Sequence, residues 1–200
     1  MKDRVLVAIT GGIGSGKTCV SKIIEKYGFK VFSCDEIYRE ISKTENYINR
    51  LKEVFPFAVD ENGGLNRAEL SKAVFNNQTQ LNKLNKLAHP LILSELERRI
   101  AKEKGLIFCE VPLLFETGLQ EKFDYVLIVL RPLSARIDAV IERDLTTKEE
   151  VLKRVENQFN YENIEKFPPN YLIIENKAGL QELKEQTENL IKKLIVKHEM

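Results

Sequence analysis

A glycine-rich stretch at residues 11–18 (GGIGSGKT) constrains this chain more than any other part of the sequence. It matches the pattern G-x-x-x-x-G-K-[ST], a loop whose backbone amides surround the phosphates of a nucleotide. Glycine lets the backbone adopt positive φ and approach a ligand closely, and the helix that follows adds a partial positive charge. In this pattern Lys17 contacts the β- and γ-phosphates, and the hydroxyl of Thr18 is a ligand of Mg²⁺. We therefore predict that the chain binds a nucleoside triphosphate.

The residues on either side of the loop agree with this prediction. Residues 4–9 form a short apolar run, which is typical of a parallel strand buried on both faces. Apolar side chains recur at helical spacing over residues 20–27, and Gly28 follows where a helix is expected to end. Strand, loop and helix in this order predict an α/β fold of the P-loop type.

Size and composition narrow the class further. With 200 residues, 43% of them hydrophobic and 30% charged, the chain fits one domain with room for an inserted subdomain. The net charge of +1 gives no reason to expect a nucleic-acid or membrane partner, and we expect a monomer. Three cysteines without a C-x-x-C pair indicate reduced thiols and a cytoplasmic location. The two histidines are far apart in the sequence, so the metal we expect is Mg²⁺ brought by the nucleotide.

A second strand is expected over residues 29–32, and Asp35 follows it closely. Ligands of open α/β sheets bind beyond the carboxyl ends of the strands, which favours a place for Asp35 near the terminal phosphate. Asp35 is then a candidate general base for an attacking hydroxyl. Alternatively, Ser33 or Asp35 caps the next helix. The sequence favours neither of these two roles over the other, and both can occur together.

Residues 42–105 contain no convincing strand and are expected to be helical. A turn at residues 60–64 separates two helices, and Asn66 followed by Glu69 resembles a capping box. A helical insert between strands would suit a kinase that holds a phosphate acceptor over its loop. For most of these residues, helix packing without substrate contact is the better explanation, and His89 taken alone would be a structural histidine.

Three further strands are predicted over residues 106–111, 125–130 and 171–174. With the two earlier strands they give a five-stranded parallel sheet. Glu110, near the end of the first of them, either reaches Mg²⁺ through water or hydrogen-bonds to a neighbouring group. An apolar loop with one acidic residue, 112–116, follows this strand.

Residues 131–169, between the last two strands, are expected to form a mobile helical lid. Such a lid excludes water and brings arginines to the transferred phosphoryl group. Arg136 and Arg143 are the candidates for that contact, although most charges here would suit a solvated helical hairpin. The turn at 175–179 (ENKAG) lacks the aspartate of the guanine-binding N-K-x-D pattern, which disfavours a GTPase and leaves its backbone as a candidate adenine contact.

Taken together, these motifs resemble the dephospho-coenzyme A kinase family over nearly the whole chain. The P-loop occurs in many kinases, whereas an HP pair and a PLLFE segment at this spacing are specific to the family. The residues that carry the resemblance are Thr10 to Thr18, Asp35 with Arg39, Gly64 to Arg67, His89-Pro90, Pro112 to Glu116, Arg143-Asp144, Gln158 and Asn176.

The resemblance implies that the chain uses MgATP to phosphorylate the ribose 3′-hydroxyl of dephospho-CoA, the last step of coenzyme A synthesis. It implies that Asp35 is the base, and we expect Lys17 and Arg143 to act with it in catalysis. The expected nucleotide contacts are Gly12, Ile13, Gly14, Ser15, Gly16, Lys17, Thr18, Cys19 and Asn176, with Thr18 on the metal. The expected acceptor contacts are Thr10, Asp35, Arg39, His89, Pro112, Leu113 and Leu114.

The chain departs from the family pattern in a few places. Ser33 and Cys34 replace an aspartate and an alanine, Asn66 replaces an aspartate, and Ala139 stands where the lid usually carries an arginine. Two alternatives therefore stay open. One is a kinase of another small acceptor such as a nucleoside monophosphate, and the other is a regulatory switch that hydrolyses nucleotide without an acceptor.

Overall fold

The computed structural model describes residues 3–74, 77–161, 168 and 170–198. The chain forms two compact units, one made of residues 34–102 and the other of residues 1–33 and 103–200. The smaller unit contains most of the segment 42–105, and a role for that segment in holding an acceptor stays a prediction.

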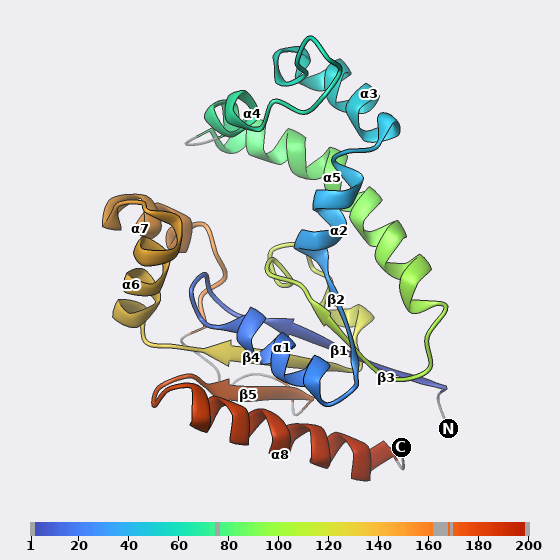
Figure 1. Cartoon of the computed structure of the whole chain (residues 1–200), viewed down its shortest axis with the longest axis vertical. Coiled ribbons are helices and arrows are strands. Elements are labelled where there is room, and N and C mark those ends of the chain that lie inside the picture. Colours follow the sequence, from blue (N-terminus) through green and yellow to red (C-terminus); the bar gives the residue numbers. More distant parts are fainter. Residues whose placement is uncertain (1–2, 75–76, 162–167, 169, 199–200) are drawn as a thin grey trace. The chain divides into compact units, whose positions relative to one another are not determined.

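The larger unit is built on a five-stranded sheet in the order β2-β3-β1-β4-β5 (Figure 1). Every pair of neighbouring strands is parallel, so the predicted fold class is confirmed. β1 lies at the centre of the sheet, where Ile9 pairs with Glu110 on one side and with Leu127 on the other. The strands are β1 (Arg4–Thr10), β2 (Lys30–Ser33), β3 (Gly105–Glu110), β4 (Tyr125–Leu130) and β5 (Tyr171–Glu175).

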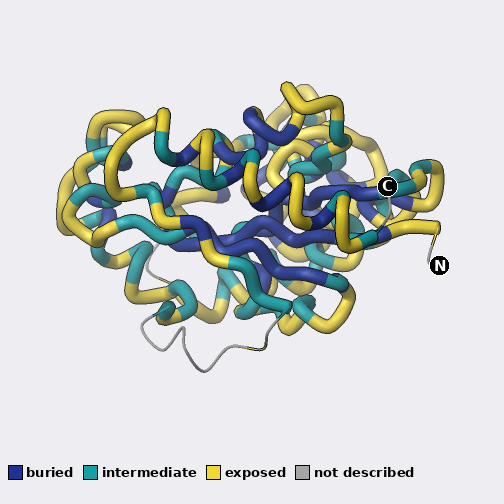
Figure 2. The backbone as a smooth tube through the Cα atoms, turned by 90° about the horizontal axis from the view of Figure 1, so that it is seen from below, coloured by how far each residue is buried: buried dark blue, intermediate teal, exposed yellow. Residues whose placement is uncertain are grey.

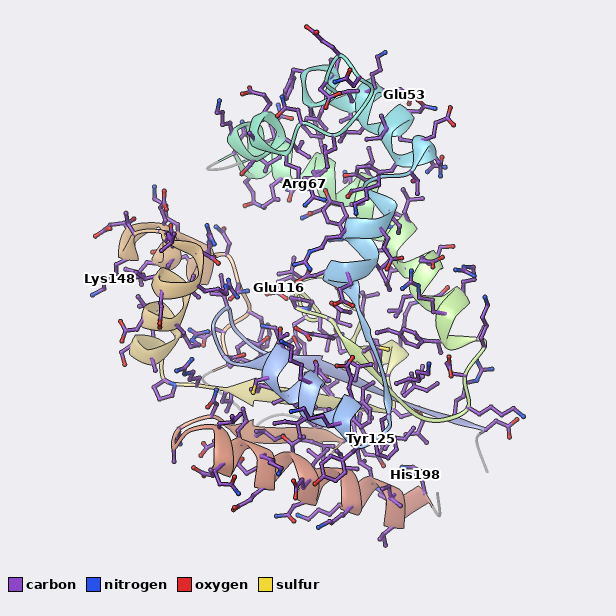
Figure 3. The ribbon with its side chains drawn as sticks, in the orientation of Figure 1. Glu53, Arg67, Glu116, Tyr125, Lys148 and His198 are labelled. Atoms are coloured by element: carbon purple, nitrogen blue, oxygen red, sulfur yellow. The ribbon has the colours of Figure 1, made fainter. Side chains whose placement is uncertain are left out.

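Helices α1 (Lys17–Lys26) and α8 (Leu180–His198) cover one face of this sheet. Alternate strand residues point to the same face, and those of β1, β3 and β4 form a core with the apolar faces of both helices. In Figure 2 the buried parts of the backbone lie mostly in the interior, and exposed residues lie mostly toward the outside. At the far end of α8, Nε2 of His198 lies 3.0 Å from the hydroxyl of Tyr125, and Figure 3 labels both side chains.

Two helices, α6 (Leu133–Asp144) and α7 (Lys148–Glu156), lie between β4 and β5 in the chain. They confirm the helical prediction for this part of the segment 131–169, whereas residues 162–167 and 169 of that segment lie outside the described residues. A short 3₁₀ helix, η2 (Gln120–Lys122), precedes β4. No helix within the described residues has both the length and the apolar character needed to span a membrane.

Within its described residues, the smaller unit contains helices and turns and no strand, apart from one isolated bridge between Val59 and Leu65. Its core contains the fully buried Tyr47, Leu51 and Phe55. Its elements are α2 (Cys34–Ile41), α3 (Glu45–Val54), η1 (Pro56–Ala58), α4 (Arg67–Val74) and α5 (Gln78–Ile100).

Local signals in the smaller unit match the structure well. The side chain of Asn66 accepts a hydrogen bond from the amide of Glu69 at 3.2 Å, as the capping-box pattern predicted. The carboxylate of Asp60 accepts bonds from the amides of Asn62 and Gly64, which closes the predicted turn. The helix α5 continues through Pro90 without a break.

The second strand begins one residue later than predicted. Gly28 has a φ of 87°, so the turn after α1 is still closing at Phe29, whose amide bonds to the carbonyl of Ile24 at 3.4 Å. Sheet pairing starts at Lys30, opposite Ile107. Phe29 is apolar because its ring packs edge-on against Phe108, with the ring centres 5.9 Å apart.

Candidate active site

The loop of residues 11–16 connects the central strand β1 to α1. Its glycines Gly11, Gly14 and Gly16 have φ angles of 145°, 75° and 102°, as the sequence predicted for a loop that turns its amides inward. The amide of Ser15 donates to the carbonyl of Gly12 at 3.1 Å, which closes the turn. Gly16 is the N-cap of α1, so the positive end of that helix faces the loop.

Lys17, the first residue of α1, extends back across the loop. Its Nζ donates to the carbonyl of Gly11 at 2.8 Å and to that of Gly12 at 3.1 Å. The positive charge therefore lies at the entrance of the loop, where an incoming phosphate would meet it.

Glu110, at the end of β3, is bonded to two hydroxyl groups of α1. Its Oε1 accepts from Thr18 at 3.0 Å, and its Oε2 accepts from Ser21 at 2.7 Å. Of the two readings that the sequence left open for Glu110, the structure shows the hydrogen bond to a neighbouring group. Ser21 was missed by the sequence analysis, because its spacing from Thr18 is equally typical of an ordinary helix residue.

The helix α6 packs directly on the loop. A Cβ atom at Gly12 would collide with Nη1 of Arg136, and one at Gly14 would collide with the carbonyl oxygen of Arg136. The side chain of Ile13 packs against the apolar cluster that α6 and α7 share, which includes Ile137 and Val151. Figure 1 shows these two helices beside the loop. Gly14 is therefore needed for helix contact as well as for backbone conformation, whereas a side chain at Gly12 would displace the flexible end of the Arg136 side chain.

Arg136 and Arg143, the two candidate arginines, both belong to α6 but lie in different surroundings. The guanidinium of Arg136 is half-buried beside Gly12, and its Nε has no hydrogen-bond partner within the described part of the chain. Burial lowers its pKa from the ordinary value. Arg143 is exposed at the end of α6 and forms an ion pair with Asp144 at 2.7 Å. Arg154 also pairs with Asp144, at 2.8 Å.

The segment after α7 returns to the loop. Oε1 of Gln158 accepts a hydrogen bond from the amide of Ile13 at 2.7 Å. The hydroxyl of Tyr161 lies 3.4 Å from Oγ1 of Thr10, and burial raises its pKa to about 12. The sequence analysis did not single out Tyr161, because it lies in a stretch without helical or strand periodicity.

The PLLFE segment, residues 112–116, anchors this returning segment. Leu114 is fully buried, and the ring of Phe115 lies 4.3 Å, centre to centre, from that of Phe159. Oε1 of Glu116 accepts a hydrogen bond from the amide of Phe159 at 2.7 Å. The motif therefore has a structural role within the larger unit, whatever it contacts in a substrate.

A cavity of about 550 Å³ opens beside the loop. Its walls come from the loop, the ends of β4 and β5, the start of α6 and the segment after α7. Residues that define it include Gly12, Arg131, Arg136, Gln158, Tyr161 and Lys177. Asn176, directly after β5, also holds the loop, since its Nδ2 donates to the carbonyl of Ser15 at 2.9 Å.

In the smaller unit, Asp35 and Arg39 are both exposed on α2, four residues apart and hence on one face of the helix. Asp35 lies in the first turn of α2, so its negative charge also stabilises the helix through the partial positive charge of the N-terminus. His89 is half-buried in α5, and burial lowers the pKa of its imidazole, which is therefore neutral at pH 7.

Comparison with known proteins gives a consistent result. The model of a family described as dephospho-CoA kinase matches residues 5–182. A dephospho-CoA kinase of Fusobacterium nucleatum is 33% identical over 92% of this chain and 95% of its own length. One of Staphylococcus saprophyticus is 34% identical over 93% of this chain and 92% of its own length.

Solved structures agree in fold. A crystal structure from Thermus thermophilus has a TM-score of 0.83 at 31% identity and covers 96% of this chain and 99% of that protein. A dephospho-CoA kinase from Campylobacter jejuni has a TM-score of 0.71 at 26% identity and covers 98% of this chain and 100% of that protein.

Proposed function

The chain belongs to the dephospho-CoA kinase family, and we propose that it transfers the γ-phosphoryl group of ATP to the ribose 3′-hydroxyl of dephospho-CoA. The products are ADP and coenzyme A. The observation that carries this proposal is a phosphate loop with Lys17 at its entrance and α6 seated upon it, in a chain that matches the family over residues 5–182.

The phosphates of ATP would be held by the loop amides of residues 12–17, by the charge of Lys17 and by the N-terminus of α1. The cavity beside the loop would receive the rest of the nucleotide, and Asn176, which donates to the carbonyl of Ser15, would contact the adenine. Cys19 would contribute its backbone in the first turn of α1. These contacts would offset the negative charge of the triphosphate and orient it, and none of them requires a covalent bond to the protein.

The residues present fit a Mg²⁺ ion that arrives with ATP. No group of three or more His, Cys, Asp and Glu side chains within the described residues could hold a metal, so protein ligands would be few. Mg²⁺ commonly binds in this way, through one or two protein oxygens, water and phosphates. Thr18 would supply the hydroxyl ligand, and Glu110 orients that hydroxyl through its hydrogen bond. When bound, the ion neutralises charge on the phosphate oxygens.

The acceptor contacts that we propose are Thr10, Arg39, His89, Pro112, Leu113 and Leu114. Asp35 would accept the proton of the 3′-hydroxyl while the oxygen of that hydroxyl forms a bond to the γ-phosphorus. The bond from that phosphorus to the β–γ bridging oxygen breaks, and ADP leaves with the electron pair. The exposed carboxylate of Asp35 and its position on one helix face with Arg39 support these roles.

Arg136 is the lid arginine that we favour for stabilising the transferred group. Its guanidinium lies against Gly12, and its Nε has no hydrogen-bond partner among the residues that the structure describes, whereas the guanidinium of Arg143 is engaged with Asp144. Arg136 would then compensate for Ala139, where the family pattern has an arginine. The role expected for Arg143 stays a weaker alternative.

The direct test is incubation of the purified chain with MgATP and dephospho-CoA, followed by chromatography for coenzyme A. A panel of nucleoside monophosphates in the same ADP-release assay would detect the rival acceptor class. ADP release at the full rate without any acceptor would support the regulatory switch instead. We further propose that the enzyme works as a cytoplasmic monomer, with no nucleic-acid or membrane partner.

A further inference from the structure

The side chain of Gln158 binds a backbone amide of the phosphate loop. Its Oε1 accepts a 2.7 Å hydrogen bond from the amide of Ile13, which is 145 residues away in the sequence. Gln158 also forms part of the wall of the cavity beside Gly12 and Arg136. The proposed function assigns the same amide to a phosphate oxygen of ATP. Because one N–H group donates one strong bond, the glutamine and the phosphate exclude each other there.

Several hydrogen bonds other than that of Gln158 also hold the loop. These are the hydrogen bonds from the Ser15 amide to the carbonyl of Gly12, from Nζ of Lys17 to the carbonyls of Gly11 and Gly12, and from Nδ2 of Asn176 to the carbonyl of Ser15. Arg131 adds a further bond, from Nη1 to the carbonyl of Gly14 at 3.2 Å. Loss of the Gln158 carbonyl should therefore leave the loop in place and free the amide of Ile13.

The chain holds Gln158 close to this amide. The next residue, Phe159, is held by the hydrogen bond from its backbone amide to Oε1 of Glu116 at 2.7 Å and by the contact of its ring with that of Phe115. A tethered acceptor has a high effective concentration, so even one neutral hydrogen bond can compete with a ligand in solution.

We propose that Gln158 is an internal competitor for the phosphate loop, and that its side-chain carbonyl must leave the amide of Ile13 before a nucleotide phosphate binds there. The inference rests on the proposed function and adds a residue that lowers nucleotide affinity. Since a phosphate oxygen replaces the glutamine oxygen, the number of hydrogen bonds to the loop is conserved during the exchange.

The test measures the Kd of ADP by calorimetry, with no acceptor present. Gln158→Met keeps the length of the side chain and removes the acceptor, so ADP should bind about two- to tenfold more tightly. Gln158→Glu makes a stronger, charge-assisted bond to the amide and should weaken ADP binding. Asn157→Met and Asn157→Asp are the matched controls, because the Asn157 side chain is exposed and donates a hydrogen bond to the carbonyl of Lys153 in α7, the helix that it follows.

A second readout follows the amide of Ile13 itself. In a chain labelled with ¹⁵N-isoleucine, the Ile13 signal should shift in Gln158→Met and should shift in the unmodified chain on addition of ADP. If Gln158→Met fails to fold, Gln158→Ala replaces it.

Unchanged or weaker ADP binding in Gln158→Met would overturn the proposal and make Gln158 a support of the loop. Equal weakening in Gln158→Glu and Asn157→Asp would also overturn it, since general charge repulsion would then explain the effect. An unmodified chain that binds no ADP would instead overturn the proposed function, and with it the premise of this inference.

Discussion

Thr18 donates a hydrogen bond to Glu110, with 3.0 Å between Oγ1 and Oε1. The other oxygen of the same carboxylate accepts from Ser21 at 2.7 Å. Glu110 is only 6% exposed, so its orientation depends on these two hydroxyl groups. We therefore propose that Ser21 is a positioning residue, which would act on the proposed metal ligand Thr18 through Glu110.

Ser21→Ala should destabilise the chain, because it leaves a buried carboxylate oxygen without its donor. We expect a loss of about 1–3 kcal/mol in the free energy of unfolding, measured by urea denaturation. Ser134→Ala, at an exposed position of α6, is the control and should change stability by about 0.5 kcal/mol or less. The Mg²⁺ concentration that half-saturates activity should rise in Ser21→Ala alone. Equal stability of the two variants would contradict this account.

Gly14→Ala tests the contact between the loop and α6. Gly14 and Gly63 have nearly equal φ angles, 75° and 76°, but a Cβ at Gly63 would meet no atom within 4 Å. Gly63→Ala therefore measures backbone strain alone, about 1–2 kcal/mol. Gly14→Ala should cost more, because it also pushes against the backbone of Arg136, and it should raise the KM for ATP. Thermal denaturation and steady-state kinetics measure the two effects, and equal values for the two variants would remove the helix contact from the explanation.

Arg136→Ala and Arg143→Ala test which of the two arginines of α6 contributes to catalysis. We expect a loss of about 10²-fold or more in kcat/KM for ATP in Arg136→Ala, because its guanidinium lies against the phosphate loop. Arg143→Ala should change kcat/KM only a few-fold, since Asp144 keeps its bond to Arg154 at 2.8 Å. The reverse order of effects would restore Arg143 as the catalytic arginine.

Strands buried on both faces were the easiest elements to predict. The strand β4 has the predicted bounds, Tyr125 to Leu130, because an uninterrupted apolar run can only be accommodated between two covering layers. The second strand was harder to delimit, because Phe29 is apolar for packing on Phe108 rather than for sheet pairing. Local patterns do not distinguish these two causes.

Contacts across long stretches of sequence escaped local patterns. The phosphate loop was identified from its own glycines and Lys17, whereas the approach of Arg136 to Gly12 depends on how α6 packs. Likewise, Tyr161 reaches Thr10 across 151 residues, and nothing in the sequence around either residue indicates the other. The roles proposed for Asp35 and His89 stay predictions, since they depend on a bound acceptor.

Asp35→Asn tests the proposed base. The amide cannot accept the proton of the attacking hydroxyl, so kcat should fall by about 10²- to 10⁴-fold, while the Kd of ATP stays the same. Glu36→Gln removes the same charge at the neighbouring exposed position in the first turn of α2, and it should leave kcat within a few-fold of the unmodified value. Calorimetry with ATP and a coupled ADP assay measure the two constants. Because loss of charge alone would affect both variants alike, only a large and selective loss in Asp35→Asn supports proton transfer to Asp35, and nearly full activity would exclude it from the mechanism.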